Sequence, residues 1–273
     1  MTNSILTKGD VKKAAVTWFF TSHLTYNYQR LQAGALATLM GPVLNKLYKG
    51  DNAKISEGLE RHMLFFNSEP RIGSIIPGIS VALEEGMATE EGENVDHTLV
   101  TNIKTALMGP LAGIGDTLWS GLLKQIVLSI FLGWALLGNI WAPIACAILL
   151  FSLDFTITYK LFLRGYEFGM ESVEKFLDSN FVKNITSALG IVGLICLGAM
   201  IVKYVSINTV LKIELETGTL NLRSLLDKLI PYIIPLSATI LGFWLQVKGK
   251  SINMVLLVLF VLGFIGGATG ILG

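Results

Sequence analysis

Four stretches of the chain lack Asp, Glu, Lys and Arg over a length that can cross a lipid bilayer. A transmembrane helix needs roughly 20 mostly apolar residues for a hydrocarbon core about 30 Å thick. The four windows are Gln125–Leu153, Asn184–Val202, Leu229–Val247 and Ser251–Gly273. The first is long enough for either one tilted span or a tight hairpin, because Gly138, Asn139 and Pro143 lie near its middle. The fold class predicted is therefore an all-α integral membrane protein with several transmembrane helices.

The composition agrees with a membrane location and excludes several other classes. Hydrophobic residues make up 52% of the 273 residues and charged residues 15%, whereas soluble domains are about 25% charged; the mean hydropathy is +0.61. The net charge of +1 offers no basic surface for nucleic acid. The two cysteines, Cys146 and Cys196, lie in apolar runs and form no disulfide framework or paired metal-ligand motif.

The first half of the chain is apolar but interrupted. Ala14–Gln29, Leu31–Asn45 and Ile72–Leu83 are too short to span a bilayer alone, and such lengths fit re-entrant, interfacial or protein-buried segments. We therefore expect three regions, as follows: an N-terminal arm with the first membrane-associated helices (1–50), a core with re-entrant elements (51–124), and a transmembrane scaffold (125–273).

The distribution of Lys and Arg predicts the orientation of the C-terminal spans. The positive-inside rule places the short Lys248–Lys250 loop in the cytoplasm. By alternation, the loop at 203–228 is external and the stretch at 154–183 internal. Within the external loop, apolar and polar residues alternate over Val210–Glu216 before Thr217-Gly218-Thr219, which predicts a small β-hairpin.

The segment Gly109–Asp116 is the first candidate functional element. Asp116 is the single charge within Thr105–Leu123, and an ionisable residue in an apolar segment usually faces a bundle interior or a watery pathway. The helix breakers here, Gly109, Pro110, Gly113 and Gly115, favour a broken helix or hairpin whose free backbone groups, with Asp116, bind a hydroxylated solute. The alternative is that Asp116 caps a helix beginning near Thr117 while the glycines pack against neighbouring helices.

A second element follows a predicted amphipathic helix at Ile55–Phe66. Pro70 ends this helix and forces extended backbone on Glu69, so Asn67 and Glu69 would lie at the mouth of the apolar segment that begins at Ile72. The alternative is an ordinary turn at a helix C-terminus.

A third polar set, between two apolar runs, contains Tyr26, Asn27, Gln29 and Gln32. Amide groups pair with sugar hydroxyls, and aromatic rings pack against sugar C–H faces. Aromatic residues beside an arginine are equally typical of a membrane-interface belt.

No catalytic, metal or cofactor site is predicted. His23, His62 and His97 have no paired spacing, and each is expected to face solvent or to form a hydrogen bond. The acidic residues Glu84, Glu85 and 90–96 are most simply a solvated loop.

The sequence resembles the IID components of the mannose/fructose/sorbose family of the bacterial phosphoenolpyruvate-dependent phosphotransferase system (PTS). The resemblance extends over nearly the whole chain and rests on four ordered blocks: Asn27–Gln32, Arg61–Pro70, Ala82–Glu85 and Leu107–Asp116, the last followed by Trp119.

The resemblance implies a multi-pass protein of the bacterial cytoplasmic membrane that forms a sugar pathway with a IIC partner. Phosphate would pass through soluble IIA and IIB units to a hexose-type sugar, and IID would carry no phosphohistidine or phosphocysteine. Trimers of IIC–IID heterodimers are implied, as is a role as receptor for certain bacteriocins, for which the loop after Lys203 is the candidate contact. The resemblance does not specify the sugar.

We expect Asn67 and Asp116 to bind the sugar, with weaker roles for Asn27, Gln29, Gln32 and Glu69. Pro70, Gly109, Pro110, Gly113 and Gly115 would form the hinge of a mobile core. One alternative is a scaffold subunit that assembles and stabilises IIC without touching the sugar. Another, an autonomous channel or membrane enzyme, is disfavoured by the missing catalytic set.

Overall fold

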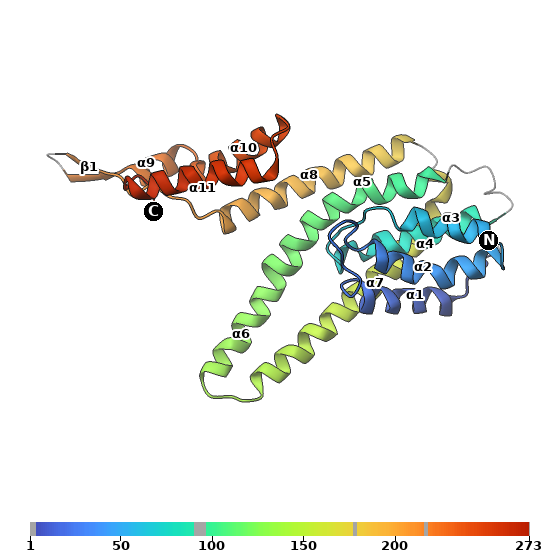
Figure 1. Cartoon of the computed structure of the whole chain (residues 1–273). Helices are drawn as coiled ribbons and strands as arrows, with labels where there is room; N and C mark the ends of the chain where they lie inside the picture. The colour runs from blue at the N-terminus through green and yellow to red at the C-terminus, as the bar shows by residue number, and fades with distance from the viewer. Residues whose placement is uncertain (1–3, 90–96, 177–178, 216–217, 273) are drawn as a thin grey trace. The chain divides into compact units, whose positions relative to one another are not determined.

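The structure, a computed structural model, describes residues 4–89, 97–176, 179–215 and 218–272. The chain forms two compact units, Met1–Cys196 and Leu197–Gly273, and the described residues are predominantly helical (Figure 1). The elements of the first unit are α1 (Lys8–Thr21), α2 (Ala33–Tyr48), α3 (Asn52–His62), the 3-10 helix η1 (Ile72–Ser74), α4 (Ile75–Met87), α5 (Thr98–Gly115), the π-helix η3 (Asp116–Leu123), α6 (Lys124–Leu136) and α7 (Ala142–Phe176). Helix α8 (Ser179–Tyr204) begins in this unit.

The short apolar segments of the N-terminal half form helices buried in protein. Thr7 and Asp10 form a capping box that starts α1, and the Asp51 side chain caps α3. Their apolar faces enclose one core, whose fully buried members include Trp18, Leu36, Met40, Leu44, Phe66 and Ile76. Helix α3 confirms the predicted amphipathic helix but ends at His62, so the polar residues that follow lie on extended backbone.

Helices α4 and α7 cross very closely because glycine lies at the crossing. A Cβ atom on Gly165 would lie 2.3 Å from the Ile75 carbonyl oxygen, and one on Gly78 would lie 2.1 Å from the Phe162 carbonyl oxygen. Neither neighbour can move without shifting a helix backbone. This contact fixes α7 against the helix that follows the polar loop.

Replacing Gly165 by Ala is expected to destabilise the first unit by about 1–3 kcal/mol, the usual effect of overpacking. The matched control is Gly133→Ala in α6, where a Cβ would meet nothing within 4 Å. The measurement is the thermal unfolding midpoint of the purified protein in detergent. Equal midpoints for the two variants would contradict the close crossing.

The segment Gly109–Asp116 is helical, and the predicted hairpin at this position is wrong. Helix α5 continues through Pro110 and passes directly into η3 and α6. A glycine inside a helix lowers its stability by only about 1 kcal/mol relative to alanine. Membrane helices also tolerate proline where neighbouring groups bond to the carbonyl that has lost its N–H partner. The irregularity lies after these residues, in the wide turns of the π-helix.

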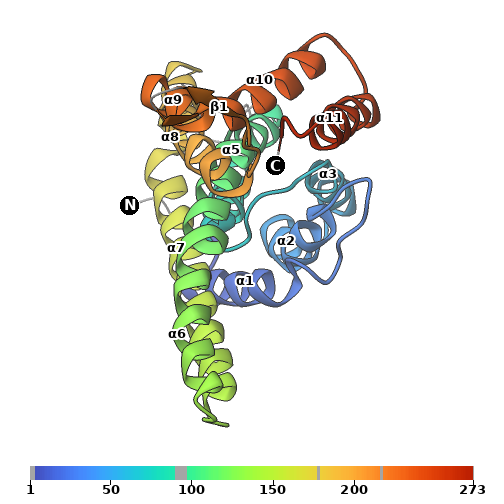
Figure 2. The same ribbon diagram turned by 90° about the vertical axis from the view of Figure 1, so that its left-hand side faces the viewer.

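The long window Gln125–Leu153 forms a hairpin. Helix α6 ends at Leu136, Gly138 adopts a positive φ of 84° in the turn, and α7 begins at Ala142. Figures 1 and 2 show α6 lying beside the first part of α7. Two helical stretches of the described chain are long and apolar enough to cross a membrane, Thr98–Leu136 and Ala142–Glu171.

The described part of the second unit contains a two-stranded sheet and three further helices. Strands β1 (Lys212–Leu215) and β2 (Gly218–Asn221) pair antiparallel with Lys212 opposite Asn221, which confirms the predicted β-hairpin. Helices α9 (Leu222–Leu229) and α10 (Ile233–Val247) meet at a 72° bend and form a third candidate span if they are taken together. The last helix is α11 (Ile252–Ala268).

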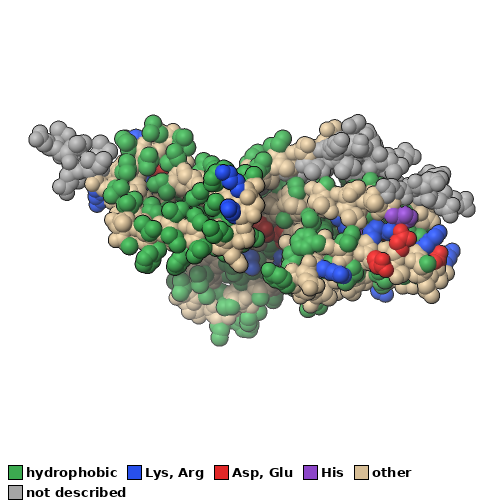
Figure 3. All heavy atoms as spheres, turned by 45° about the horizontal axis from the view of Figure 1, so that its top comes forward, with side chains coloured by type: hydrophobic (Ala, Val, Ile, Leu, Met, Phe, Trp, Pro, Cys, Tyr) green, Lys and Arg blue, Asp and Glu red, His purple; other side chains and the backbone are tan. Residues whose placement is uncertain are grey.

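Exposed side chains of this unit are largely apolar. Figure 3 shows hydrophobic side chains gathered over it, in the left-hand part of the view. On α11, Leu256, Phe260 and Phe264 are more than half exposed. Such a surface is typical of contact with lipid or with another membrane subunit.

Candidate functional site

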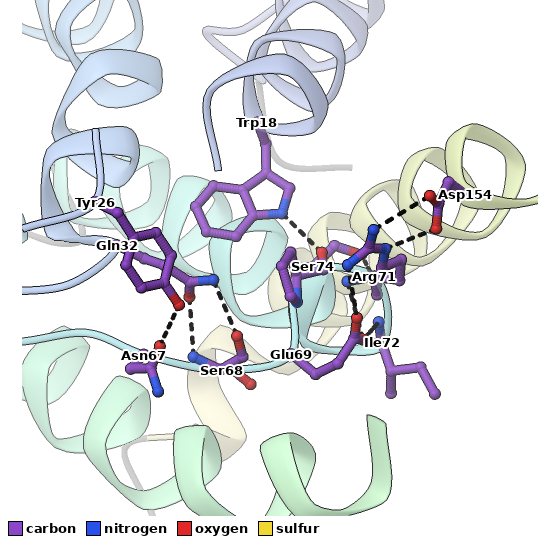
Figure 4. Close-up of polar contacts among 11 residues, drawn as sticks. Trp18, Tyr26, Gln32, Asn67, Ser68, Glu69, Arg71, Ile72, Ser74 and Asp154 are labelled. Carbon is purple, nitrogen blue, oxygen red and sulfur yellow. Dashed lines mark hydrogen bonds and ion pairs between the residues drawn. The ribbon is translucent and has the colours of Figure 1, made fainter. Parts of the chain in front are cut away.

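The loop after α3 runs as extended chain beside the turn that precedes α2 (Figure 4). The Gln32 backbone N–H donates to the Phe66 carbonyl at 2.9 Å, and the Phe66 N–H donates to the Arg30 carbonyl at 3.4 Å. The Gln32 side chain continues this pairing, since its Oε1 accepts from the Ser68 N–H at 2.9 Å and its Nε2 donates to the Ser68 carbonyl at 3.0 Å. The loop therefore has a defined position against the N-terminal helices.

Asn67 and Tyr26 meet on the open side of this loop. The Tyr26 hydroxyl donates to Asn67 Oδ1 at 2.7 Å, and the Tyr26 ring stacks on His23 with centroids 5.7 Å apart. Burial, and secondarily the negative charge of Asp116, raise the pKa of Tyr26, so the phenol remains protonated. Asn67 Nδ2 makes no hydrogen bond within the described residues and is free to donate to a solute.

Glu69, Arg71 and Asp154 form an ion-pair network that ties the loop to α7. Arg71 donates to both carboxylate oxygens of Asp154, at 2.6 Å from Nε and 3.2 Å from Nη2. Buried Glu69 accepts from the backbone N–H groups of Arg71 and Ile72 at 3.0 and 2.8 Å, and from Arg71 Nη1 at 3.4 Å. Burial nonetheless raises the pKa of Glu69 above its ordinary value.

Two features of the α5–η3 helix complete this network. A Cβ on Gly115 would lie 2.4 Å from Glu69 Cβ, so glycine is needed to admit the glutamate. The π-helix places the buried ring of Trp119 with its centroid 5.6 Å from Arg71 Cζ, a cation–π contact. π-helical turns within α-helices frequently occur at functional sites.

Further hydrogen bonds hold the ends of the loop. Trp18 Nε1 donates to the Pro70 carbonyl at 3.0 Å, and Ser74 Oγ donates to the Thr158 carbonyl at 3.0 Å. Contacts from α1, the turn before α2, α5, η3 and α7 therefore converge on residues 66–74 (Figure 4). The loop is preorganised rather than an ordinary helix-terminal turn.

Asp116 is exposed and is the first residue of η3. Its backbone is helical, as is that of Gly115 before it, so it does not cap a new helix and that part of the alternative is wrong. The other part, close packing of glycines, agrees with the contacts of Gly113 and Gly115. Its carboxylate makes no hydrogen bond or ion pair within the described part of the chain. An unpartnered carboxylate in a segment apolar enough to span a membrane is unfavourable unless it faces water or a ligand.

The structure gives several predicted sugar contacts other roles. Both amide atoms of buried Gln32 bond to Ser68, and the Glu69 carboxylate is used within the loop, so neither group is available to a solute. Asn27 Oδ1 accepts from the Arg30 N–H at 2.8 Å and shapes its own turn. Gln29 is exposed without a side-chain hydrogen bond in the described structure. Tyr26 and His23 lie at the site instead. The only sign of this in the sequence was an aromatic residue beside amide side chains.

Of the predicted hinge residues, Gly115 and Pro70 lie at the site itself. Gly113 faces Gly193 of α8, where a Cβ on Gly113 would lie 3.9 Å from the Gly193 Cα. A Cβ on Gly109 would meet nothing within 4 Å. Gly109, Pro110 and Gly113 therefore belong to a continuous helix, and their hinge role stays a prediction.

A second polar cluster lies in the core, away from the loop. Glu84 accepts from Arg61 Nε and Nη2 at 2.9 and 3.1 Å and hydrogen-bonds with His62 Nε2 at 2.9 Å. Lys104 Nζ donates to the Arg61 carbonyl at 2.8 Å. The pKa of His62 is lowered mainly by burial, so this side chain is neutral near pH 7.

The prediction that Glu84 and Glu85 belong to a solvated loop is wrong. Both are buried on α4, and Glu85 accepts hydrogen bonds from the Ser4 hydroxyl, the Leu6 N–H and the Tyr166 hydroxyl at 2.9, 2.7 and 2.5 Å. The partners come from distant parts of the chain, which local charge patterning does not reveal. Residues 90–96 of the same predicted loop lie outside the described residues.

No group of three or more His, Cys, Asp or Glu side chains suited to a metal is present in the described chain. The fold and the site define a helical integral membrane protein with free polar groups at an irregular helix, the arrangement typical of solute transporters. A family model described as "PTS system mannose/fructose/sorbose family IID component" matches residues 5–272. The chain therefore belongs to this family, whose members are IID components of PTS sugar permeases.

Individual relatives agree over essentially the full length. The chain is 32% identical to the fructose permease IID component of Bacillus subtilis (strain 168), covering 96% of this chain and 97% of that one. It is 31% identical to the mannose-specific EIID component of Escherichia coli (strain K12), covering 100% and 97%. It is 30% identical to the sorbose-specific EIID component of Lacticaseibacillus casei, covering 98% and 95%.

A solved structure shows the same fold. One chain of the cryo-EM structure of the mannose transporter ManYZ in complex with microcin E492 superposes with a TM-score of 0.74 at 29% identity. The match covers 99% of this chain and 100% of that chain. This likeness confirms the predicted class of membrane protein.

Proposed function

We propose that this protein, with a IIC partner, forms the pathway by which a hexose-type sugar crosses the bacterial cytoplasmic membrane while IIA and IIB units phosphorylate it. The protein itself carries no phosphoryl group in this scheme. The family membership supports the system, and the buried, hydrogen-bonded state of His62 supports the absence of a phosphorylated histidine there. A trimer of IIC–IID heterodimers is part of the proposal.

A direct role of this protein in the sugar pathway is supported most strongly by Asp116. Its carboxylate is exposed and has no partner within the described residues, and it lies in a helix that is long and apolar enough to cross a membrane. Nearby, Asn67 has a free amide donor and Tyr26 an accessible ring. A sugar hydroxyl both donates and accepts, so Asp116 would accept from one hydroxyl while Asn67 Nδ2 donates to another. The Tyr26 ring suits the C–H face of the sugar.

Asp116→Ala is expected to lower sugar uptake about tenfold to a hundredfold, because a hydrogen bond to a charged group is worth about 1.5–3 kcal/mol. Uptake and phosphorylation of mannose, fructose and sorbose would be measured in cells that also express the IIC, IIA and IIB partners. Asp227→Ala is the control for loss of a carboxylate elsewhere in the chain, since Asp227 is a partly exposed aspartate of α9 that pairs with Arg223 and accepts a hydrogen bond from the Tyr232 N–H at 3.1 Å. Wild-type uptake by Asp116→Ala at normal abundance would refute the assignment.

The second candidate function is a scaffold that assembles IIC without touching the sugar. Close glycine contacts such as Gly78 and Gly165 favour efficient helix packing. If Asp116→Ala and Asn67→Ala both leave uptake unchanged while a helix-packing variant reduces recovery of IIC, the scaffold reading is correct. Uptake loss with normal IIC recovery supports the pathway.

We also propose that the region after Lys203 can contact bacteriocins. Its support is the related transporter structure, which contains microcin E492. Deletion of the β1–β2 hairpin, followed by a killing assay and a sugar uptake assay, tests this idea. Unchanged sensitivity in cells that keep uptake would exclude the hairpin as a contact.

A further inference from the structure

We infer that Gln32 is a positioning residue that aims Asn67 at the sugar without touching the sugar itself. This inference rests on the proposed function, because it concerns the side chain assigned there as a hydrogen-bond donor. It replaces the sequence-based expectation that Gln32 is a direct contact. Its basis is the pattern of bonds on either side of Asn67.

Gln32 holds the residue before Asn67 and the residue after it. Its backbone N–H binds the Phe66 carbonyl, and its side-chain amide binds both the N–H and the carbonyl of Ser68. Successive side chains on extended backbone point to opposite sides. Phe66 and Ser68 are buried at 0% and 4% exposure while Asn67 is partly exposed, so the burial follows this alternation.

The amide of glutamine is the side chain that suits this role. It carries one acceptor and two donors at its end, so a single residue satisfies both backbone groups of Ser68 as a neighbouring strand would. Glutamate would keep the acceptor for the Ser68 N–H but lose the donor for the Ser68 carbonyl. Methionine has a similar length and would lose both bonds.

Tyr26 fixes the remaining freedom of Asn67. Its hydroxyl donates to Asn67 Oδ1, so this oxygen faces Tyr26 and Nδ2 points away from Tyr26 as a donor (Figure 4). Gln32 therefore sets the position of the Asn67 backbone, and Tyr26 sets the direction of its amide. A hydroxyl oxygen of the sugar would meet a donor already held in place, which lowers the ordering entropy that binding must overcome.

The test is a double-mutant cycle on the purified IIC–IID complex. The dissociation constant would be measured for whichever of mannose, fructose and sorbose the wild-type complex binds most tightly. Asn67→Ala is expected to weaken binding about tenfold or more, and Gln32→Met by a similar factor. The double variant is expected to bind like Asn67→Ala alone, because Gln32 has no effect once its target is removed.

Each outcome distinguishes this inference from the proposed function. If Asn67→Ala binds like wild type, the assignment of Asn67 to the pathway falls, and the positioning role falls with it. If Asn67→Ala weakens binding but Gln32→Met does not, or if the two losses multiply in the double variant, only the positioning role falls. A purely structural role for Gln32 predicts the multiplied loss.

Two controls guard against misfolding. Gln246→Met changes the same residue type on α10, where the side chain is exposed and makes no hydrogen bond in the described structure, and is expected to bind like wild type. If Gln32→Met yields no folded complex, Gln32→Glu replaces it in the cycle and is expected to give a smaller loss that again vanishes in the Asn67→Ala background. A loss that persists in that background overturns the inference.

Discussion

Glu84→Gln is expected to destabilise the folded protein by about 3–5 kcal/mol, the usual effect of breaking a buried ion pair from one side. The substitution keeps the shape of the side chain but removes the only buried anion that Arg61 contacts among the described residues. Arg61 is 8% exposed and Lys104 3% exposed, so Lys104 would remain buried without its nearby anion and Arg61 would keep only its 3.4 Å contact with the exposed Glu57. A folded domain is typically stable by only about 5–15 kcal/mol, so we expect low recovery of folded protein.

The chain offers a matched control for this prediction. Glu57 also pairs with Arg61, at 3.4 Å, but its side chain is 57% exposed. Glu57→Gln is expected to change stability by less than about 1 kcal/mol, because exposed pairs contribute little. Thermal unfolding in detergent measures both variants, and similar midpoints for Glu84→Gln and Glu57→Gln would show that the core cluster does not stabilise the fold as described.

Arg71→Met is expected to reduce the stability of the folded protein by about 2–3 kcal/mol. This is less than the effect of breaking a fully buried ion pair, because Arg71 and Asp154 are partly exposed. The change leaves Asp154 and buried Glu69 without their cation and removes the contact with Trp119. Sugar uptake should fall as well, since the loop that carries Asn67 would lose its ion pair with Asp154 of α7. Arg71→Lys should restore stability only in part, because lysine does not form the bidentate contact.

The matched control is Arg164→Met on α7, whose pair with Glu167 is highly exposed. Its unfolding midpoint and uptake should stay close to wild type. In Arg71→Met the pKa of Glu69, already raised by burial, loses the opposing effect of Arg71. The folded state then binds a proton more tightly than the unfolded state, so the deficit should shrink as the pH falls towards the unfolded pKa near 4.3. A deficit independent of pH would contradict the role of these charges.

Local patterns predicted the elements well where one physical signal dominated. Charge-free windows became α8, α10 and α11, and the amphipathic spacing before Asn67 became α3. The alternating residues after Val210 became the β1–β2 hairpin. Asn67 and Asp116 were selected as polar residues in apolar surroundings, and both keep polar atoms free of partners within the described structure.

Predictions failed where the partner of a residue lies far along the chain. Glycine and proline at 109–115 suggested a broken element, yet the helix continues and Gly115 instead admits Glu69. The two glutamates of α4 looked solvent-exposed, yet Arg61, Tyr166 and the N-terminal segment meet them in the core. The π-helix that places Trp119 over Arg71 had no recognisable local signal.

The sequence by itself determined that this chain enters a membrane, that it is helical, and that its polar residues of interest lie in the N-terminal half. Hydrophobic length and periodicity carry that information because each residue contributes to it locally. Only the tertiary structure decided which polar groups are used internally and which remain free. Gln32 and Asn67 are both amides in similar surroundings of sequence, but Gln32 meets both backbone groups of Ser68 while Asn67 retains a free donor. Hydrogen-bond satisfaction depends on partners brought together by folding, and that is a property of three-dimensional position.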